Sequence, residues 1–329
     1  MIRPSPKTAS AATTTRSSKL GRRRRGRLVD GILILDKPAG RSSNGALQVA
    51  RAIFNAAKAG HTGSLDPLAT GVLPVCFGEA TKFSQYLLDA DKAYDATVVL
   101  GVATETGDAE GEISAETSAA ALTEVQVRQA AEQFVGEIDQ IPSMYSALKK
   151  DGKPLYELAR QGIEIEREAR RITVYSLEIT AFRPGERAEV DISVRCSKGT
   201  YIRSLAEDLG QALGVGGHVA MLRRTAAGPF SLDQSVTLDA LQVLRDADDF
   251  PALDALLEPI DLALPQLPMI ELGDTAGYYL LQGQPVQVPN APTEGLVGLK
   301  LKTGQFVGVG EILSDGRIAP RRLISNVRQ

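Results

Sequence analysis

The segment that most constrains this chain is residues 60–71, Gly-His-Thr-Gly-Ser-Leu-Asp-Pro-Leu-Ala-Thr-Gly. Its three glycines and one proline leave little room for a regular helix or strand, because proline fixes its own φ and glycine adopts positive φ easily. Asp66 precedes the proline and is pushed toward an extended conformation. The pattern therefore predicts an ordered, sharply turned loop that presents one carboxylate, one imidazole and three hydroxyls. A purely structural Asp-Pro turn is the alternative.

Cysteine and histidine are scarce in this chain of 329 residues, which narrows the kinds of site it can hold. The two cysteines, Cys76 and Cys196, form no CxxC pair, which argues against a disulfide framework or structural zinc site and fits a reducing compartment. Two histidines, His61 and His218, are too few for a His-rich metal centre. No apolar run approaches the roughly 20 residues that cross a membrane. We expect no metal, no cofactor, no membrane span, a cytoplasmic location, and two cysteines buried at strand ends.

The net charge of −3 conceals an uneven distribution. Residues 1–29 hold nine of the 37 basic residues and no acidic residue, which leaves 28 basic against 40 acidic residues, a net charge of −12, in the rest. This first segment lacks apolar periodicity, so it predicts a disordered basic tail that adds salt-sensitive phosphate affinity. An organelle transit peptide has a similar composition. An acidic body can bind nucleic acid only where positive charge is gathered locally.

Apolar periodicity predicts both strands and helices in the body of the chain. Strands are expected over residues 32–35, 72–77, 94–100 and 190–196. Helices are expected over residues 43–57 with Ser43 as the cap, 79–88, 123–134 with a Thr123/Gln126 capping box, 154–162 and 202–214. Because these elements lack the regular alternation of a doubly wound sheet, we expect an α+β fold with a mixed, mostly antiparallel central sheet and flanking helices.

Composition changes between residues 246 and 268, where aspartates precede several prolines. This change predicts a linker or connecting segment. Beyond it, a helix over residues 276–281 and short strands separated by glycine turns predict a small β-rich module.

Residues 143–171 gather basic and aromatic side chains. The basic residues are Lys149, Lys150, Lys153, Arg160, Arg167, Arg170 and Arg171, with Tyr145 and Tyr156 among them. Basic residues interleaved with aromatics suit an RNA backbone and its exposed bases. Four glutamates dilute the charge, so composition alone leaves a solvated helical hairpin as the alternative.

Six segments, taken in order, resemble one enzyme family. Residues 60–71 resemble the catalytic motif of the tRNA pseudouridine-55 synthases, the TruB family. The other matches are residues 31–40 (Gly-Ile-Leu-Ile-Leu-Asp-Lys-Pro-Ala-Gly), 92–94 (Lys-Ala-Tyr), 140–149 (Gln-Ile-Pro-Ser-Met-Tyr-Ser-Ala-Leu-Lys), 196–205 (Cys-Ser-Lys-Gly-Thr-Tyr-Ile-Arg-Ser-Leu) and 222–225 (Leu-Arg-Arg-Thr). The resemblance covers residue 31 to the C-terminus, and six ordered matches are far more specific than any single one.

The resemblance implies an architecture and an activity. It implies a catalytic domain over residues 30–250 with an RNA-gripping insertion at about 143–171, followed over residues 251–329 by a linker and a PUA-like RNA-binding domain. The implied activity is isomerisation of uridine to pseudouridine at position 55 in the T loop of tRNA, with base flipping and without metal or cofactor. The absence of a P-loop and of a dinucleotide fingerprint fits a reaction that needs neither phosphate energy nor redox chemistry. We expect a monomer that binds the T arm and needs no obligate protein partner.

The resemblance also assigns three catalytic residues. Asp66 would be the nucleophile or base, attacking C6 of the uracil or C1′ of the ribose, or abstracting the 2′ proton; the sequence does not choose among these. Arg203, near the start of its predicted helix and off the apolar face, would keep the Asp66 carboxylate ionised against desolvation. Tyr94 would stack on the uracil and help remove the C5 proton. A surface ion pair and a core tyrosine are the structural alternatives for Arg203 and Tyr94.

Five further residues are assigned to substrate binding. His61 would occupy the space of the extruded base or stack on a neighbour, with local hydrogen bonding as its alternative. Lys37 would meet a phosphate or support the Asp66 loop, and Leu222 would line the base pocket. Gly63 and Tyr201, inside two of the motifs, are assigned to substrate binding with them.

Three other functions remain open at this point. A non-catalytic RNA-folding chaperone would bind the same RNA without turnover. Chaperone activity can also accompany catalysis in one protein, and the intact set of Asp66, Tyr94 and Arg203 argues that catalysis is retained. An unrelated hydrolase with an aspartate nucleophile would fail to bind a T-arm hairpin. A guide-RNA-dependent relative would need partner proteins, whereas the basic insertion here favours stand-alone recognition.

Overall fold

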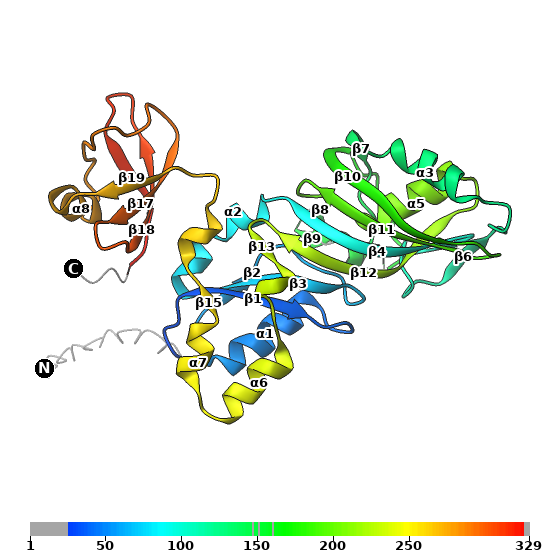
Figure 1. The fold of residues 1–329 in the computed structure, drawn as a ribbon, viewed down its shortest axis with the longest axis horizontal. Helices are drawn as coiled ribbons and strands as arrows, with labels where there is room; N and C mark the ends of the chain where they lie inside the picture. The colour runs from blue at the N-terminus through cyan, green and yellow to red at the C-terminus, as the bar shows by residue number, and fades with distance from the viewer. Residues whose placement is uncertain (1–25, 147, 151, 160, 326–329) are drawn as a thin grey trace, which may run out of the picture.

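The computed structural model describes residues 26–146, 148–150, 152–159 and 161–325 (Figure 1). Within them, one large sheet runs through the molecule in the order β14-β1-β3-β12-β4-β11-β10-β7. Its strands are β1 (Gly31–Lys37), β3 (Thr70–Phe77), β4 (Lys92–Leu100), β7 (Gly136–Gln140), β10 (Arg170–Arg183), β11 (Ala188–Cys196), β12 (Gly217–Ala227) and β14 (Val236–Thr237). Short strands pair beside this path, namely β2 (Ala59–His61), β13 (Phe230–Ser231) and β15 (Leu257–Glu258). Pairing is antiparallel except at β1–β14 and β3–β12, which confirms the predicted α+β fold with a mostly antiparallel sheet.

Helices cover the sheet in two groups (Figure 1). The first group packs on β1 and β3 and consists of α1 (Ser43–Ile53), α6 (Leu238–Asp246) and α7 (Phe250–Ala255). The second packs on β4, β10 and β11 and consists of α3 (Glu124–Glu132) and α5 (Ile202–Ala212). Along β4 and β11 buried residues alternate with more exposed ones, so the strand pattern predicted from the sequence is the pattern of the core.

Smaller elements connect these layers. They are η1 (Gly78–Lys82), α2 (Ser84–Leu88), β5 (Val102–Thr104), β6 (Ile113–Glu116), η2 (Leu232–Gln234) and η3 (Ile260–Ala263). Cys76 in β3 and Cys196 at the end of β11 are both free and buried, as predicted. None of the helices among the described residues is long and apolar enough to cross a membrane.

Two helices differ from their predictions. Ser42, not Ser43, caps α1, because its side chain accepts a hydrogen bond from the Gly45 amide, and the helix ends at Ile53 rather than residue 57. The helix predicted over residues 79–88 divides into η1 and α2 at Phe83, which is fully buried and has a φ of −112° and a ψ of 3°, outside the range of regular helix. The Thr123/Gln126 capping box of α3 is present as predicted.

Two predicted boundaries also shift. Most of the predicted tail lies outside the described residues, but Arg27 bonds the carbonyls of Asn55 and Phe54 and pairs with Asp254, so order begins before residue 29. The segment predicted as a linker folds as α7, β15 and η3. Leu253 is fully buried, and Leu257 pairs with Leu33 of β1. The apolar residues between the prolines therefore pack into the core.

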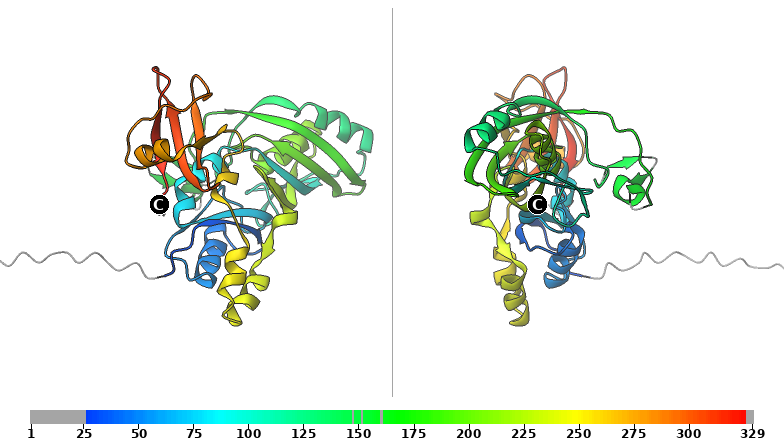
Figure 2. Two further views of the ribbon diagram at one scale, coloured as in Figure 1. Left: turned by 60° about the vertical axis from the view of Figure 1, so that its left-hand side comes forward. Right: turned by 90° about the vertical axis from the view of Figure 1, so that its right-hand side faces the viewer.

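The C-terminal part is a β-rich domain, as predicted. Its sheet has the order β16-β17-β18-β19, formed by β16 (Met269–Leu272), β17 (Leu296–Leu301), β18 (Phe306–Ile312) and β19 (Ile318–Leu323), with α8 (Asp274–Leu281) beside it. It packs against the rest of the described chain through the Phe83 and Phe306 rings, 5.3 Å apart, and an ion pair of 2.6 Å between Lys300 and Asp261. Lys82 adds a hydrogen bond of 2.9 Å to the Leu323 carbonyl. The left-hand view of Figure 2 shows this domain at one end of the large sheet.

The segment between β7 and β10 projects away from the sheet, as the right-hand view of Figure 2 shows. It holds only β8 (Lys149–Lys150), β9 (Lys153–Pro154) and α4 (Leu155–Ala159) among its described residues. This segment is the basic insertion predicted from the sequence.

Candidate active site

The Asp66 loop joins β2 to β3 and is held by buried side chains from elsewhere in the chain. Lys37, at the end of β1, is fully buried and donates to the carbonyls of Pro38 at 2.9 Å, Pro67 at 3.3 Å and Ala69 at 2.6 Å. The Ser43 hydroxyl accepts from the Leu65 amide at 2.7 Å and donates to the Leu65 carbonyl at 3.0 Å. Hydrogen bonds on both sides of Asp66 therefore fix its backbone.

Arg203 of α5 brings a guanidinium to the carboxylate of Asp66, with 3.0 Å between its Nε and Oδ2 of Asp66. Its side chain is 6% exposed, whereas that of Asp66 is 40% exposed and opens to the cavity described below. Burial raises the pKa of Asp66, and the Arg203 charge is the largest opposing influence. The arrangement is the one that keeps a partly desolvated carboxylate available in its ionised form.

A second carboxylate holds Arg203 from the other side. Asp108 is 4% exposed, and its Oδ2 lies 3.3 Å from Nη1 of Arg203. Asp108 also accepts from the Thr106 hydroxyl at 2.6 Å and the Glu110 amide at 3.1 Å. Arg203 donates further to the carbonyls of Thr106 and Tyr145 at 2.9 and 3.0 Å. Sequence reasoning missed Asp108, because a lone aspartate after Gly107 in a turn carries no motif.

A cavity of about 340 Å³ opens beside Asp66. Its lining includes Gly63, Asp66, Lys92, Tyr94, Tyr201, Arg203, Leu222 and Arg224. Tyr94 is 9% exposed, and burial raises the pKa of its hydroxyl. The cavity combines one carboxylate with three basic side chains and apolar walls, a composition suited to one polar, planar group.

Of the remaining predicted site residues, three line this cavity and two, His61 and Lys37, lie outside its lining. Gly63 and Tyr201 line it with Leu222, and the Tyr201 backbone is held by the Gln140 side chain at 2.8 and 3.0 Å. His61 lies in β2, where burial and then the Arg224 charge lower its pKa; its buried Nδ1 has no partner among the described residues. Lys37 is enclosed by loop carbonyls, which corresponds to the supporting role and not to phosphate contact.

Comparison with known proteins identifies the family of this chain. Residues 51–202 match the TruB family pseudouridylate synthase N-terminal domain, residues 203–265 the tRNA pseudouridylate synthase B C-terminal domain, and residues 268–324 the pseudouridine synthase II TruB C-terminal domain. The chain is 57% identical to tRNA pseudouridine synthase B of Stutzerimonas stutzeri over 90% of this chain and 96% of that protein. The chain belongs to the TruB family. It is accordingly a tRNA pseudouridine synthase, an isomerase, as the sequence predicted.

Other relatives agree with this TruB-family assignment. The protein of the same name from Pseudomonas aeruginosa is 55% identical over 91% of this chain and 97% of that protein. Among solved structures, the archaeal box H/ACA sRNP Nop10–Cbf5 complex contains a chain that is 28% identical, with a TM-score of 0.67 over 90% of this chain and 86% of that chain. The match spans both the catalytic sheet and most of the remaining chain, which confirms the pseudouridine-synthase fold.

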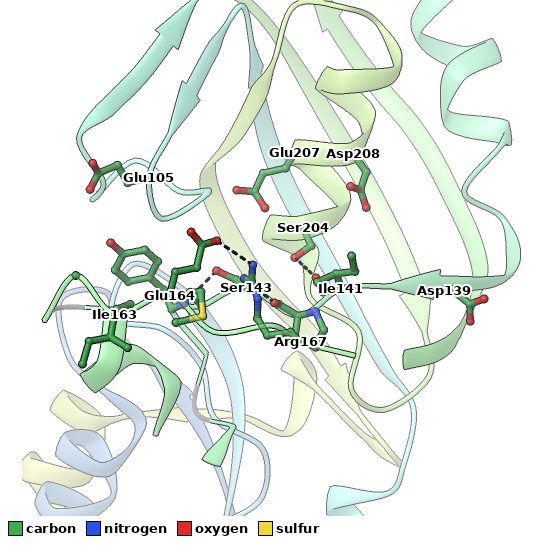
Figure 3. Close-up of a pocket in the computed structure, with 15 residues that line it drawn as sticks. Glu105, Asp139, Ile141, Ser143, Ile163, Glu164, Arg167, Ser204, Glu207 and Asp208 are labelled. Atoms are coloured by element: carbon green, nitrogen blue, oxygen red, sulfur yellow. Dashed lines mark hydrogen bonds and ion pairs between the residues drawn. The ribbon is translucent and has the colours of Figure 1, made fainter. Parts of the chain in front are cut away.

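This TruB-family chain has a second, larger cavity of about 600 Å³ between α5 and the insertion (Figure 3). Carboxylates line it, namely those of Glu105, Asp139, Glu164, Glu207 and Asp208. Burial raises the pKa of Glu207 to about 7. Because carboxylates repel phosphate, this cavity is unsuited to an RNA backbone, and the smaller cavity beside Asp66 is the candidate active site. Among the described residues, no three His, Cys, Asp or Glu side chains form a metal-binding cluster.

Proposed function

We propose that this protein isomerises uridine 55 in the T loop of tRNA, with Asp66 as the catalytic carboxylate. The observation that carries the proposal is the ion pair of 3.0 Å between Asp66 and the buried Arg203, placed at a cavity lined by Tyr94. Membership of the TruB family gives the class of reaction. The geometry supports Asp66, Arg203 and Tyr94 as the residues that carry it out.

The reaction exchanges one bond to the ribose for another. The N1–C1′ bond breaks, the uracil turns, the C5–C1′ bond forms, C5 loses a proton and N1 gains one. The Asp66 carboxylate can add to C6 or C1′, or take the 2′ proton, and in each case it must be ionised and rigidly placed. Arg203 supports both requirements by its charge and its position between Asp66 and Asp108.

The target base must leave the T loop to reach this cavity. Extrusion of a stacked base costs a few kcal/mol, and the cavity volume of about 340 Å³ suits a single nucleobase with part of its ribose. Tyr94 and Leu222 offer an aromatic and an apolar wall for the uracil, and the Tyr94 hydroxyl is the candidate acceptor for the C5 proton. His61, with its pKa lowered and Nδ1 unpartnered among the described residues, is suited to enter the vacated stack as a neutral ring.

The rest of the chain would bind RNA around this site. We assign RNA gripping to the insertion at residues 143–171 and a PUA-like RNA-binding role to the C-terminal β-rich domain. The boundary between the two main domains moves from residue 250 to about residue 265 in this proposal, because β15 pairs with β1. We further propose that the protein acts as a monomer in the cytoplasm, on the T arm alone.

The test is tritium release from a T-arm stem-loop carrying [5-³H]uridine, with wild type beside Asp66→Asn. Wild type should release tritium, and Asp66→Asn should lose at least about three orders of magnitude in rate while keeping its affinity for the RNA. An anticodon stem-loop labelled in the same way is the control for position. Substantial release by a clean Asp66→Asn preparation would remove Asp66 from the chemistry. Binding without release by either protein would favour the chaperone function.

A further inference from the structure

Two adjacent arginines on β12, Arg223 and Arg224, have opposite environments, because successive residues of a strand face opposite sides of the sheet. The Arg223 side chain is 35% exposed, and its two Nη atoms lie 3.1 and 2.8 Å from the Asp36 carboxylate oxygens. Arg224 is 1% exposed. No ion pair joins Arg224 to a carboxylate in the part of the chain that the structure describes. Such a buried charge is costly, so its retention calls for a function.

Backbone carbonyls fix the Arg224 guanidinium. Its Nε donates to the Val72 carbonyl at 2.7 Å, and its Nη2 donates to the Gly63 carbonyl at 3.1 Å. The backbone around it is equally close: a Cβ at Gly71 would lie 2.2 Å from the Arg224 carbonyl oxygen, and Gly71 has a φ of 100°. The planar fork of the guanidinium is therefore held in one orientation at the wall of the cavity that it helps to line.

Tyr94 is the direct neighbour of Arg224 across the β4–β12 ladder. Both side chains line the cavity beside Asp66, and the Arg224 charge lowers the pKa of the Tyr94 hydroxyl against the larger raising effect of burial. Cys196 and Asp66 act on the hydroxyl in the opposite direction. Of the charged groups that act on this hydroxyl, Arg224 has the largest effect.

We propose that Arg224 is a positioning residue for the isomerisation, which orients the Tyr94 hydroxyl toward the uracil from a guanidinium fixed by the Val72 and Gly63 carbonyls. This inference rests on the proposed function, in particular on the role of Tyr94. Arg224→Lys would keep the charge but lose the rigid fork that binds two carbonyls beside the Tyr94 side chain.

The test is a double-mutant cycle that combines Arg224→Gln with Tyr94→Phe, measured as the single-turnover rate of tritium release at saturating T-arm RNA. We expect Arg224→Gln to lower the rate about 100-fold and Arg224→Lys about tenfold, with RNA affinity within about threefold of wild type. In the Tyr94→Phe background, Arg224→Gln should lower the rate less than about threefold, since the hydroxyl it orients is gone. Arg223→Gln, one residue away on the other face, is the matched control and should keep the wild-type rate.

The outcomes separate this inference from the proposed function. An equal loss from Arg224→Gln in both backgrounds would indicate a merely structural arginine and overturn the inference, as would a wild-type rate for Arg224→Gln. A wild-type rate for Tyr94→Phe would overturn the proposed role of Tyr94, and the inference with it. If Arg224→Gln lacks a cooperative melting transition, the same cycle is measured with Arg224→Lys, whose effect on the rate must likewise disappear in the Tyr94→Phe background.

Discussion

The Asp66 loop and the insertion at residues 143–171 meet at Arg203 but are built in opposite ways. The loop is short, lies between two strands of the central sheet, and is held by hydrogen bonds from Lys37, Ser43 and Arg224. The insertion contains two-residue strands and one five-residue helix, and most of its described residues after α4 are exposed. Its link to Arg203 is a single hydrogen bond among the described residues, from Nη2 to the Tyr145 carbonyl.

The difference separates two requirements of the proposed reaction. The reacting carboxylate must be placed within a fraction of an ångström, which buried side chains in a packed sheet can achieve. The RNA-gripping part must follow a ligand that is itself deformed on binding, for which few internal contacts are an advantage. We therefore expect substitutions around the loop to change the rate of chemistry, and substitutions in the insertion to change binding.

The largest effect in this comparison should come from Arg203→Lys. One ammonium cannot contact Asp66 and Asp108 together as the planar fork does, so we expect the single-turnover rate to fall about 100-fold or more with little change in RNA affinity. Arg128→Lys, which keeps its exposed pair with Glu124 on α3, is the control. A near-normal rate for Arg203→Lys would show that the Asp66 geometry tolerates a mobile cation.

Asp108→Asn should have the next largest effect. The amide keeps the shape of Asp108 but removes the charge that holds Arg203 from behind, so the guanidinium loses one of its two ionic partners. We expect the single-turnover rate to fall about tenfold, since a charge-assisted bond becomes a neutral one. Unchanged kinetics would mean that the carbonyls of Thr106 and Tyr145 alone position Arg203.

Lys37→Met should lower the single-turnover rate several-fold, because the three carbonyls around the Asp66 loop lose their common donor.

The same variant should change how the stability of the folded protein depends on pH. Burial lowers the pKa of Lys37 to about 8 from 10.5, so between these values the unfolded chain binds more protons than the folded one. The free energy of unfolding should then rise with pH from about 8 to 10.5 for wild type relative to Lys37→Met. Parallel pH profiles from chemical denaturation would contradict this prediction.

Neutralising the insertion should produce the smallest change in chemistry. Lys153 and Arg170 are exposed, and replacing either by Gln should weaken T-arm binding a few-fold. For each phosphate that is no longer neutralised, the slope of log K against log salt should become shallower by about one unit. The rate at saturating RNA should stay within about twofold of wild type. Arg128→Gln, away from the insertion, should leave the salt slope unchanged. A large fall in rate at saturation would mean that the insertion helps to form the catalytic site.

The sequence predicted the strands of the sheet well, because apolar and polar residues alternate along β4 and β11 just as buried and more exposed positions do. It also predicted the catalytic-type loop, whose glycines and Asp-Pro pair are local signals. It did not predict Asp108 or the role of Ser43, since both act on residues distant in sequence and only the tertiary fold brings them together. The predicted linker failed for a similar reason: prolines signalled a connection, whereas the place of Leu253 and Leu257 in the core depends on β1 and α1.

The pairing of β1 with β14 and β15 determines when the large sheet can be completed during protein synthesis. On the ribosome, β1 emerges early, yet one edge of it stays without its partners until residues 236–258 have been made. At about 5–20 residues per second, synthesis of the roughly 220 residues from the end of β1 to the end of β15 takes about 10 to 45 s. Lys37, on which the Asp66 loop depends, sits at the end of this waiting strand. We therefore expect the proposed active site to be completed late in translation, and a nascent chain interrupted before β15 would carry every proposed catalytic residue on an unfinished sheet.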